Sequence, residues 1–243
     1  CSVTYRINSR HFGLRYAGDQ AMKWFFRHVE MGIILEDDII PHPSFFPFCE
    51  MLLKKYENDH RVMQISGYNF GYKSQSKNSY YFSRLPHVWG WATWKRAWDR
   101  YDGDIRDWPH LKKQKVLQGV FSNRLDQLFW ERELDDIYSK KFNTWDYQWY
   151  LRIWRDGGCA VVPSVNLVRN IGFGPEATHT TDPNEFRIRT MQAMKFPLVH
   201  PGSLMPDSLA EAYVQKHHFI PTRSNSYAKS VFHQLFNSIM RRI

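Results

Sequence analysis

The apolar residues of this chain alternate between short continuous runs and longer stretches with helical spacing. Over 19–29 the apolar side chains recur at intervals of three and four residues, which predicts a helix. The run Ile33-Ile34-Leu35 that follows is uninterrupted and rich in β-branched residues, which is typical of a strand covered on both faces. Ser44 can cap the next helix. Strands and helices that alternate in this way favour an α/β fold with a mainly parallel central sheet flanked by helices.

The same alternation extends over most of the chain. The C-terminal part becomes rich in loop-forming residues, and 229–243 repeats apolar residues at helical spacing beside basic ones, which predicts an amphipathic basic helix. We therefore expect a main domain over 1–200 and a C-terminal loop and helix over 201–243. The remaining predicted elements are strands over 3–7, 62–65, 80–82 and 159–162, and helices over 44–57, 91–101, 118–141 and 143–155.

The composition is that of a folded protein with an excess of positive charge. Of the 243 residues, 43% are hydrophobic, and 33 Lys and Arg against 24 Asp and Glu give a net charge of +9. Such a charge indicates an anionic partner, for which nucleic acid, anionic lipid and nucleotide-sugar phosphates all qualify. No helix-turn-helix, zinc-finger or RNA-recognition pattern accompanies the basic residues, so we do not expect nucleic acid as a partner.

Apolar runs and cysteines bear on the compartment. No apolar run is long enough to span a bilayer. The 3 cysteines are far apart, which argues against a disulfide framework and for a reducing compartment. We therefore expect a cytoplasmic protein, with the basic helix over 229–243 either packed against the protein or bound at the inner face of the membrane. Because Cys1 leads directly into strand-like residues, we also expect that the start of a longer protein is missing.

Three adjacent carboxylates, Glu36-Asp37-Asp38, are the strongest chemical signal in the sequence. They come directly after the strand predicted over 33–35, and ligand sites in open α/β sheets lie at the carboxyl ends of strands. Desolvating such a cluster is unfavourable unless a partner compensates its charge. Mg²⁺ or Mn²⁺, shared with a diphosphate, would be such a partner. The alternative is that the acids cap the following turn or pair with surface Lys and Arg residues.

Four segments stand out along the chain. They are Gly-Ile-Ile-Leu-Glu-Asp-Asp-Ile over 32–39 with Pro-Ser-Phe-Phe over 43–46, Gly-Trp-Ala-Thr-Trp over 90–94, Trp-Asp-Tyr-Gln-Trp over 145–149, and Phe-Gly over 173–174 followed by His179. In this order they resemble segments of the GT-A nucleotide-sugar glycosyltransferases, and most closely the N-acetylglucosaminyltransferase I type, in which a strand ends in Glu-Asp-Asp and is followed by a Pro-x-Phe-Phe helix start. The chain is also similar to bacterial nucleotide-diphospho-sugar transferases described as haemolytic-protein-like.

This resemblance implies a fold and an activity. It implies a GT-A catalytic domain over 1–200 that transfers a sugar from a nucleoside diphosphate sugar to an acceptor hydroxyl, with inversion, in glycan or envelope polysaccharide synthesis. Mn²⁺ or Mg²⁺ would be the cofactor, and a glycan or a lipid-linked molecule would be the acceptor. The family's first strand–helix unit, which grips the nucleotide base, has no counterpart in this chain.

The resemblance also implies roles for individual residues. Asp38 would be the direct metal ligand, and His179 would lie near the metal or the diphosphate in a closing loop. Asp146 would be the general base that deprotonates the acceptor hydroxyl, although Tyr147 stands where the family has a second acid. For the tryptophans, core packing is the alternative to stacking on a sugar. The further candidates are Glu36, Asp37, Asn8 and Trp91 on the donor side and Gly90 and Trp145 on the acceptor side.

Two other functions stay open at this point. The same acids could serve a metal-dependent phosphodiesterase or nuclease, in which the net charge of +9 would hold a polyanion. The chain could also be a non-catalytic sugar-binding remnant of a transferase. Release of nucleoside diphosphate from a nucleotide sugar distinguishes the transferase from both alternatives.

Overall fold

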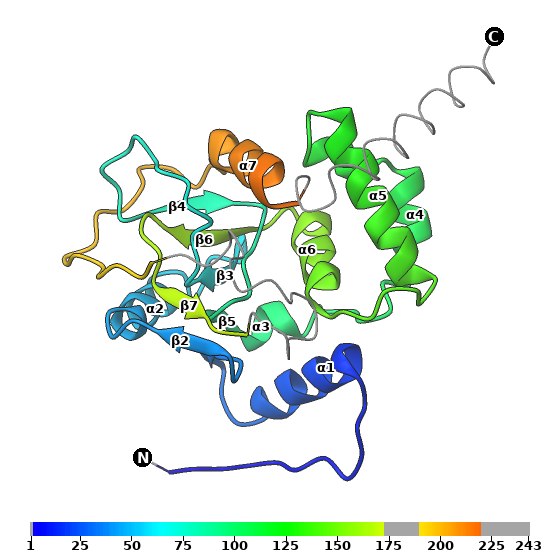
Figure 1. The fold of residues 1–243 in the computed structure, drawn as a ribbon, viewed down its shortest axis with the longest axis horizontal. Coiled ribbons are helices and arrows are strands. Elements are labelled where there is room, and N and C mark those ends of the chain that lie inside the picture. Colours follow the sequence, from blue (N-terminus) through cyan, green and yellow to red (C-terminus); the bar gives the residue numbers. More distant parts are fainter. Residues whose placement is uncertain (1, 173–189, 220–243) are drawn as a thin grey trace.

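The structure is a computed structural model, and it describes residues 2–172 and 190–219. A five-stranded sheet with the strand order β1-β5-β3-β6-β4 forms its centre, and β2 pairs with β7 in a second, small sheet (Figure 1). The strands are β1 (Met31–Ile34), β2 (Ile39–Pro41), β3 (Val62–Ser66), β4 (Tyr80–Ser83), β5 (Trp91–Trp94), β6 (Cys159–Pro163) and β7 (Val168–Asn170). The helices are α1 (Leu14–Phe25), α2 (Phe45–Lys55), α3 (Lys95–Trp98), α4 (Trp108–Lys113), the 3₁₀ turn η1 (Val116–Gly119), α5 (Arg124–Tyr138), α6 (Asp146–Arg155), α7 (Ser208–Val214) and the π-helical turn η2 (Gln215–Phe219).

The fold is therefore mixed α/β, as predicted, but the prediction of a mainly parallel sheet is wrong. Among the described strands, only β3 and β6 pair in parallel, whereas β1–β5, β3–β5 and β4–β6 are antiparallel pairs. A loop rather than a helix connects β3 with β4, so the chain re-enters the sheet from the edge at which β3 ends. Continuous apolar runs indicate that both faces of a strand are covered, but they carry no information on strand direction.

Most of the predicted elements are present with shifted bounds. The helix predicted over 19–29 is α1, which begins and ends earlier, and the helix predicted over 118–141 is the shorter α5. Residues 91–94, predicted as the start of a helix, form β5, because this run is buried throughout and pairs with β1 on one side and β3 on the other. Residues 3–7 form no strand, and their apolar side chains are exposed.

Helix α6 connects the two halves of the core, since it lies between the central sheet and α5 (Figure 1). On the sheet side, Nε1 of Trp149 donates a 2.7 Å hydrogen bond to Oε1 of Gln64 in β3. On the other side, Tyr150 stacks on Trp130 of α5 with ring centroids 5.4 Å apart. The helix that begins at Asp146 is therefore held from both sides.

The described part of the C-terminal region packs on the same body. Pro206 bridges to Phe82 of β4, and Arg84 forms an ion pair of 2.5 Å with the buried Glu211 of α7. The helix predicted over 229–243 lies outside the described residues. Within 2–172 and 190–219, none of the helices combines the length and the apolar character that crossing a membrane requires.

Candidate functional site

One edge of the central sheet brings together two segments that the sequence singled out, the acids after β1 and the glycine before β5. The strand register pairs Ile34, at the carboxyl end of β1, with Trp91, at the amino end of β5. Ser66, at the carboxyl end of β3, pairs with the same Trp91. The acids that follow β1 and the glycine that precedes β5 therefore lie at one edge, where side chains from several strands can meet.

Gly90 allows the close approach of the strands at this edge. Its φ of +59° is in the left-handed region that favours glycine, and its amide oxygen accepts a 2.7 Å hydrogen bond from the Gly67 amide. A Cβ atom at Gly90 would lie 2.8 Å from Val168 and 3.2 Å from Ile39. The start of β5 consequently packs directly against the β2–β7 pair, to which the acidic residues lead.

The three acids occupy a turn immediately after β1. The amide of Ile39 donates a 3.1 Å hydrogen bond to the carbonyl of Glu36, which closes the turn, and β2 begins at once. Glu36 and Asp37 are exposed, whereas Asp38 is half-buried. The turn keeps three negative charges close together, and like charges disfavour one another's ionised forms.

The pKa of Glu36 is the most strongly shifted of this turn. Its pKa is raised from 4.5 to about 7, first because surrounding protein displaces water from its carboxyl group, and then because of the charges of Asp38, Asp146 and Asp37. Asp146 acts on Glu36 although it comes from the start of α6, so the fold brings the two acids into one electrostatic site. Near neutral pH, Glu36 can either donate or accept a hydrogen bond.

Asp38 is enclosed by the chain that follows β7. Its backbone carbonyl accepts a 2.8 Å hydrogen bond from the Ile171 amide, and a Cβ atom at Gly172 would collide with its carboxylate. Desolvation and the charge of Asp37 raise its pKa, while a hydrogen bond from the Asn170 side chain lowers it. Its Oδ1 is buried and has no hydrogen-bond partner.

The unpartnered oxygen of Asp38 fits a divalent cation. A buried carboxylate oxygen without a partner is unfavourable, and Mg²⁺ and Mn²⁺ prefer oxygen ligands. Within the described residues, no group of three His, Cys, Asp or Glu side chains converges to hold a metal ion. A cation bound here would therefore take few ligands from these residues and the rest from water or phosphate, as Mg²⁺ commonly does.

Asp146 is the first residue of α6, and its carboxylate is held locally. The Thr144 hydroxyl donates to Oδ1 of Asp146, and the amide of Tyr147 donates to the same oxygen at 3.0 Å. A carboxylate in the first turn of a helix is also stabilised by the helix dipole. These contacts fix the position of an acid that the sequence identified and that the fold places near Glu36.

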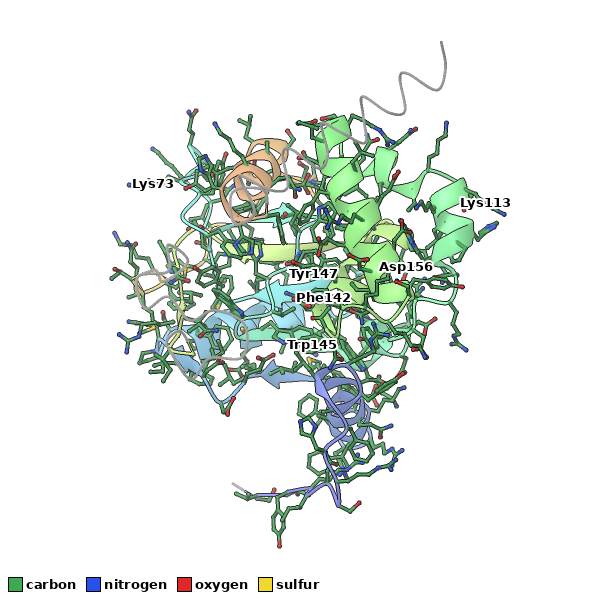
Figure 2. All side chains as sticks on the ribbon, turned by 45° about the vertical axis from the view of Figure 1, so that its right-hand side comes forward. Lys73, Lys113, Phe142, Trp145, Tyr147 and Asp156 are labelled. Carbon is green, nitrogen blue, oxygen red and sulfur yellow. The ribbon has the colours of Figure 1, made fainter. Side chains whose placement is uncertain are left out.

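Helix α1 holds the segment that leads into α6. The buried guanidinium group of Arg15 donates to the carbonyls of Ile137 and Phe142 at 2.9 and 3.0 Å. A Cβ atom at Gly18 would lie 3.1 Å from the ring of Trp145, so α1 packs closely on this residue. Figure 2 shows Trp145 at the end of α6 that faces α1. The position of Asp146 therefore depends on α1 as well as on the sheet.

The two tryptophans of the candidate site lie in the core. Trp91 is 0% exposed and Trp145 is 7% exposed, and their rings stack with centroids 5.8 Å apart. Neither ring presents a free face on which a sugar could stack. Trp89, one residue before Gly90, is only half-buried and packs edge-to-face on Tyr68 at 4.8 Å, so it is the tryptophan of this edge that reaches the surface.

The remaining candidates are not brought to this edge by the described contacts. Asn8 is exposed in an N-terminal segment without regular structure. Residues 173–174 and His179 lie outside the described residues. The described chain reaches Gly172, whose backbone lies against Asp38.

Two residues of this site were not found from the sequence. Asn170 contacts Asp38 only because β7 pairs with β2, and Arg15 supports Asp146 only because α1 packs on the segment before α6. Both are single polar residues outside any motif, and their partners are distant in the sequence. No local pattern indicates such contacts.

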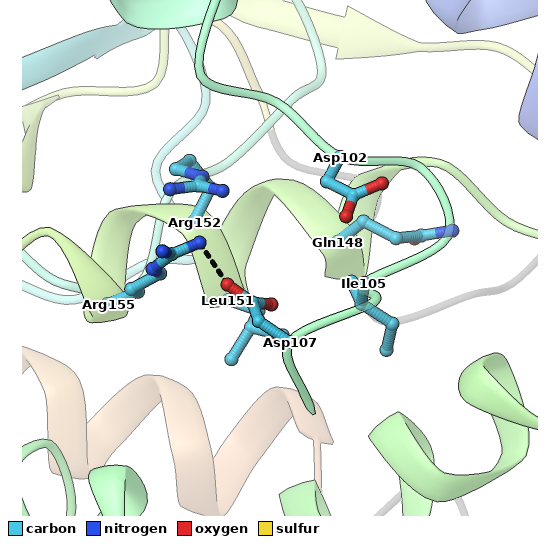
Figure 3. Close-up of a pocket in the computed structure, with 7 residues that line it drawn as sticks. All are labelled: Asp102, Ile105, Asp107, Gln148, Leu151, Arg152 and Arg155. Atoms are coloured by element: carbon cyan, nitrogen blue, oxygen red, sulfur yellow. Dashed lines mark hydrogen bonds and ion pairs between the residues drawn. The ribbon is translucent and has the colours of Figure 1, made fainter. Parts of the chain in front are cut away.

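A small hollow beside α6 is separate from the acidic turn, none of whose residues lines it (Figure 3). Arg155 forms an ion pair with Asp107 across it, and Leu151 and Ile105 supply its apolar wall. Its other charged residues, Arg152 and Asp102, pair with Asp156 and Arg106. The hollow therefore offers little unpaired charge to a ligand.

Comparison with known proteins assigns the chain to no family. No protein-family model matches the chain, and no curated protein matches it. A function for the chain therefore has to be argued from its own residues.

Proposed function

We propose that the chain is a metal-dependent glycosyltransferase of the GT-A fold, which moves a sugar from a nucleoside diphosphate sugar to an acceptor hydroxyl. The observation that carries this proposal is the pair of acidic groups at one sheet edge: Asp38 with its buried, unpartnered Oδ1, and Asp146, whose charge reaches Glu36. The reaction needs two such groups, because one must hold the donor with its cation and the other must activate the acceptor.

Asp38 would hold Mn²⁺ or Mg²⁺ together with oxygens of the donor diphosphate. The cation would neutralise the negative charge that develops on the leaving diphosphate. His179 is the second proposed ligand of this site. Gly172, the last described residue before 190, lies against Asp38, and His179 itself is outside the described residues.

Asp146 would serve as the general base. The acceptor oxygen bonds to the anomeric carbon while the bond from that carbon to the diphosphate oxygen breaks, and the diphosphate leaves with the electron pair. Asp146 takes the proton of the acceptor hydroxyl. Attack from the face opposite the leaving group inverts the anomeric carbon, and the contacts from Thr144 and Tyr147 keep the carboxylate in place.

The other candidates divide between donor and acceptor. Glu36, with a pKa of about 7, can donate a hydrogen bond to a phosphate or hydroxyl of the donor, and Asp37 is exposed beside it. Trp91 would contribute its backbone at the sheet edge, since its ring is buried. Gly90 would belong to the acceptor side through its backbone, since the space beside it is filled by Val168 and Ile39. We propose that the acceptor is a glycan or a lipid-linked molecule.

Turnover of nucleotide sugars tests this function. The full chain is incubated with Mn²⁺ and a panel of nucleotide sugars and acceptors, and released nucleoside diphosphate is measured. Asp146→Asn should reduce turnover at least about 100-fold because general-base catalysis contributes about 10²–10⁴. It should leave Mn²⁺-dependent nucleotide binding intact, whereas Asp38→Ala should lose both.

Two control variants separate these effects from general loss of charge. Asp126→Asn removes an acid from the first turn of another helix, α5, and Glu50→Gln removes an exposed acid from α2. Both variants should release nucleoside diphosphate at the normal rate.

Normal turnover by Asp146→Asn would disprove the assignment of the base. Cleavage of single-stranded nucleic acid in place of sugar release would favour a phosphodiesterase. Nucleotide-sugar binding without release would favour a non-catalytic sugar-binding protein.

A further inference from the structure

Asn170 is a buried polar residue at the acidic edge with no assigned role. It is the last residue of β7, it is 8% exposed, and the strand register pairs it with Ile39, directly after Asp38. A buried amide is retained at such a position only when its hydrogen bonds are satisfied. Its partners therefore show what it does.

The two ends of the Asn170 carboxamide make different contacts. Its Oδ1 accepts a 2.7 Å hydrogen bond from the Gly172 amide, and its amino group is left to bond the carboxylate of Asp38. The neighbouring Ile171 amide donates to the backbone carbonyl of Asp38 at 2.8 Å. The side chain and the main chain of Asp38 are thus both tied to the same three residues, 170–172.

These contacts leave one carboxylate oxygen of Asp38 unused. Oδ1 has no partner, so the bond from Asn170 falls on the other oxygen. Gly172 keeps this arrangement compact, because any side chain there would push the carboxylate away. The Asn170 amide is neutral, so it fixes the carboxylate without competing with a cation for its charge.

We propose that Asn170 is a positioning residue that holds the Asp38 carboxylate so that its Oδ1 faces a divalent cation. This inference rests on the metal site of the proposed function. Groups that bond a metal ligand from behind limit its rotation, and their removal typically weakens metal binding by about 10–100-fold. The ligand of the site is Mn²⁺ or Mg²⁺, and Asn170 itself does not touch it.

Manganese binding to the full chain tests the proposal without any sugar donor. Free Mn²⁺ is measured by electron paramagnetic resonance during titration of the wild type, Asn170→Ala and Asp38→Ala. We expect Asn170→Ala to weaken binding by about 10–100-fold and to change the spectrum of the bound ion. Asp38→Ala should abolish binding.

Asn166→Ala is the matched control. Asn166 is also buried, near the start of β7, but it bonds backbone groups, among them the carbonyl of Val168 at 2.7 Å and the amide of Asn69 at 3.3 Å. Its loss should lower the melting temperature without changing Mn²⁺ affinity. Melting curves in EDTA define a temperature at which all variants are folded, and affinities are compared there.

The outcomes separate the two hypotheses. If Asn170→Ala binds Mn²⁺ as the wild type does while Asp38→Ala does not, the positioning role is wrong and the metal site stands. Equal losses in Asn170→Ala and Asn166→Ala would reduce Asn170 to a structural residue and also overturn the inference. If the wild type binds no Mn²⁺, or Asp38→Ala binds it equally well, the metal site fails and the role of Asn170 fails with it.

Discussion

Glu36, Asp38 and Asp146 are acids of similar chemistry in three different environments. Glu36 reaches the surface among like charges, Asp38 is tied down by the chain after β7, and Asp146 begins a helix. Because each environment favours a different protonation or hydrogen-bonding state, the three can take different parts in one reaction. At this scale the site is defined by surroundings rather than by residue type.

The raised pKa of Glu36 predicts a pH-dependent stability. In the unfolded chain the group ionises near 4.5, whereas in the folded protein it does so near 7. Between these values the folded state holds the extra proton, so this group lowers stability as pH rises. Removing its charge with Glu36→Gln should therefore stabilise the protein at pH 8, and the gain should shrink toward pH 4.5.

The expected size of this effect is modest because Glu36 is exposed to screening by solvent. We expect no more than about 1 kcal/mol, or about 2–4 °C in melting temperature for a protein of this size. Melting curves in EDTA at both pH values measure it, with Glu50→Gln as the control for loss of an exposed charge. A difference between Glu36→Gln and wild type that is the same at both pH values would contradict the electrostatic explanation.

Sequence reasoning worked at this scale where the signal was local. Three consecutive acids after an apolar strand can be recognised without a structure, and they do lie at the carboxyl end of β1. Asn170 could not be recognised, because its contact with Asp38 arises only from the pairing of β2 with β7. The burial of Trp91 could not be predicted from the sequence either, because a tryptophan is suited both to core packing and to stacking on a sugar.

At the scale of elements, α1 acts as a support for the start of α6. Arg15 bonds the two carbonyls that flank the turn after α5, and Gly18 allows the helix to approach Trp145. Tyr101 adds a 2.9 Å hydrogen bond from its hydroxyl to the carbonyl of Trp145. The segment before Asp146 is consequently fixed from several directions.

Loss of the Arg15 side chain should destabilise the protein. Arg15→Ala leaves the carbonyls of Ile137 and Phe142 without these donors, and such losses cost about 2–3 kcal/mol together. Urea unfolding measures the change, with Arg27→Ala, an exposed site just after α1, expected within about 0.5 kcal/mol of wild type. Equal stabilities of the two variants would show that α1 does not support this segment.

The prediction of helix or strand succeeded where the apolar pattern was long and failed where it was short. Helical spacing over 19–29 identified α1, and Ser44 marked the start of α2. The run over 91–94 is too short for periodicity to separate strand from helix, and its pairing with both β1 and β3 decides for strand. The residues over 3–7 have strand-like composition, but no strand of the described chain pairs with them.

At the scale of the whole molecule, a mixed sheet presents one acidic edge within a basic protein. The antiparallel β5 lies between β1 and β3, so its amino end joins their carboxyl ends. Strand directions depend on which strands become neighbours, and that information is not local in the sequence. The net charge of +9 would attract an anionic donor toward the protein. A cation bound between the donor and the acids of the edge would offset the repulsion between their negative charges.

Calorimetric titration of the full chain with nucleoside diphosphates tests the central claim most directly. We predict that one of the common nucleoside diphosphates binds in the presence of Mn²⁺, that EDTA abolishes this binding, and that Asp38→Ala abolishes it while Glu50→Gln does not. Nucleotide binding that is unchanged by EDTA and by Asp38→Ala, or no binding of any nucleoside diphosphate with Mn²⁺ present, would contradict the account.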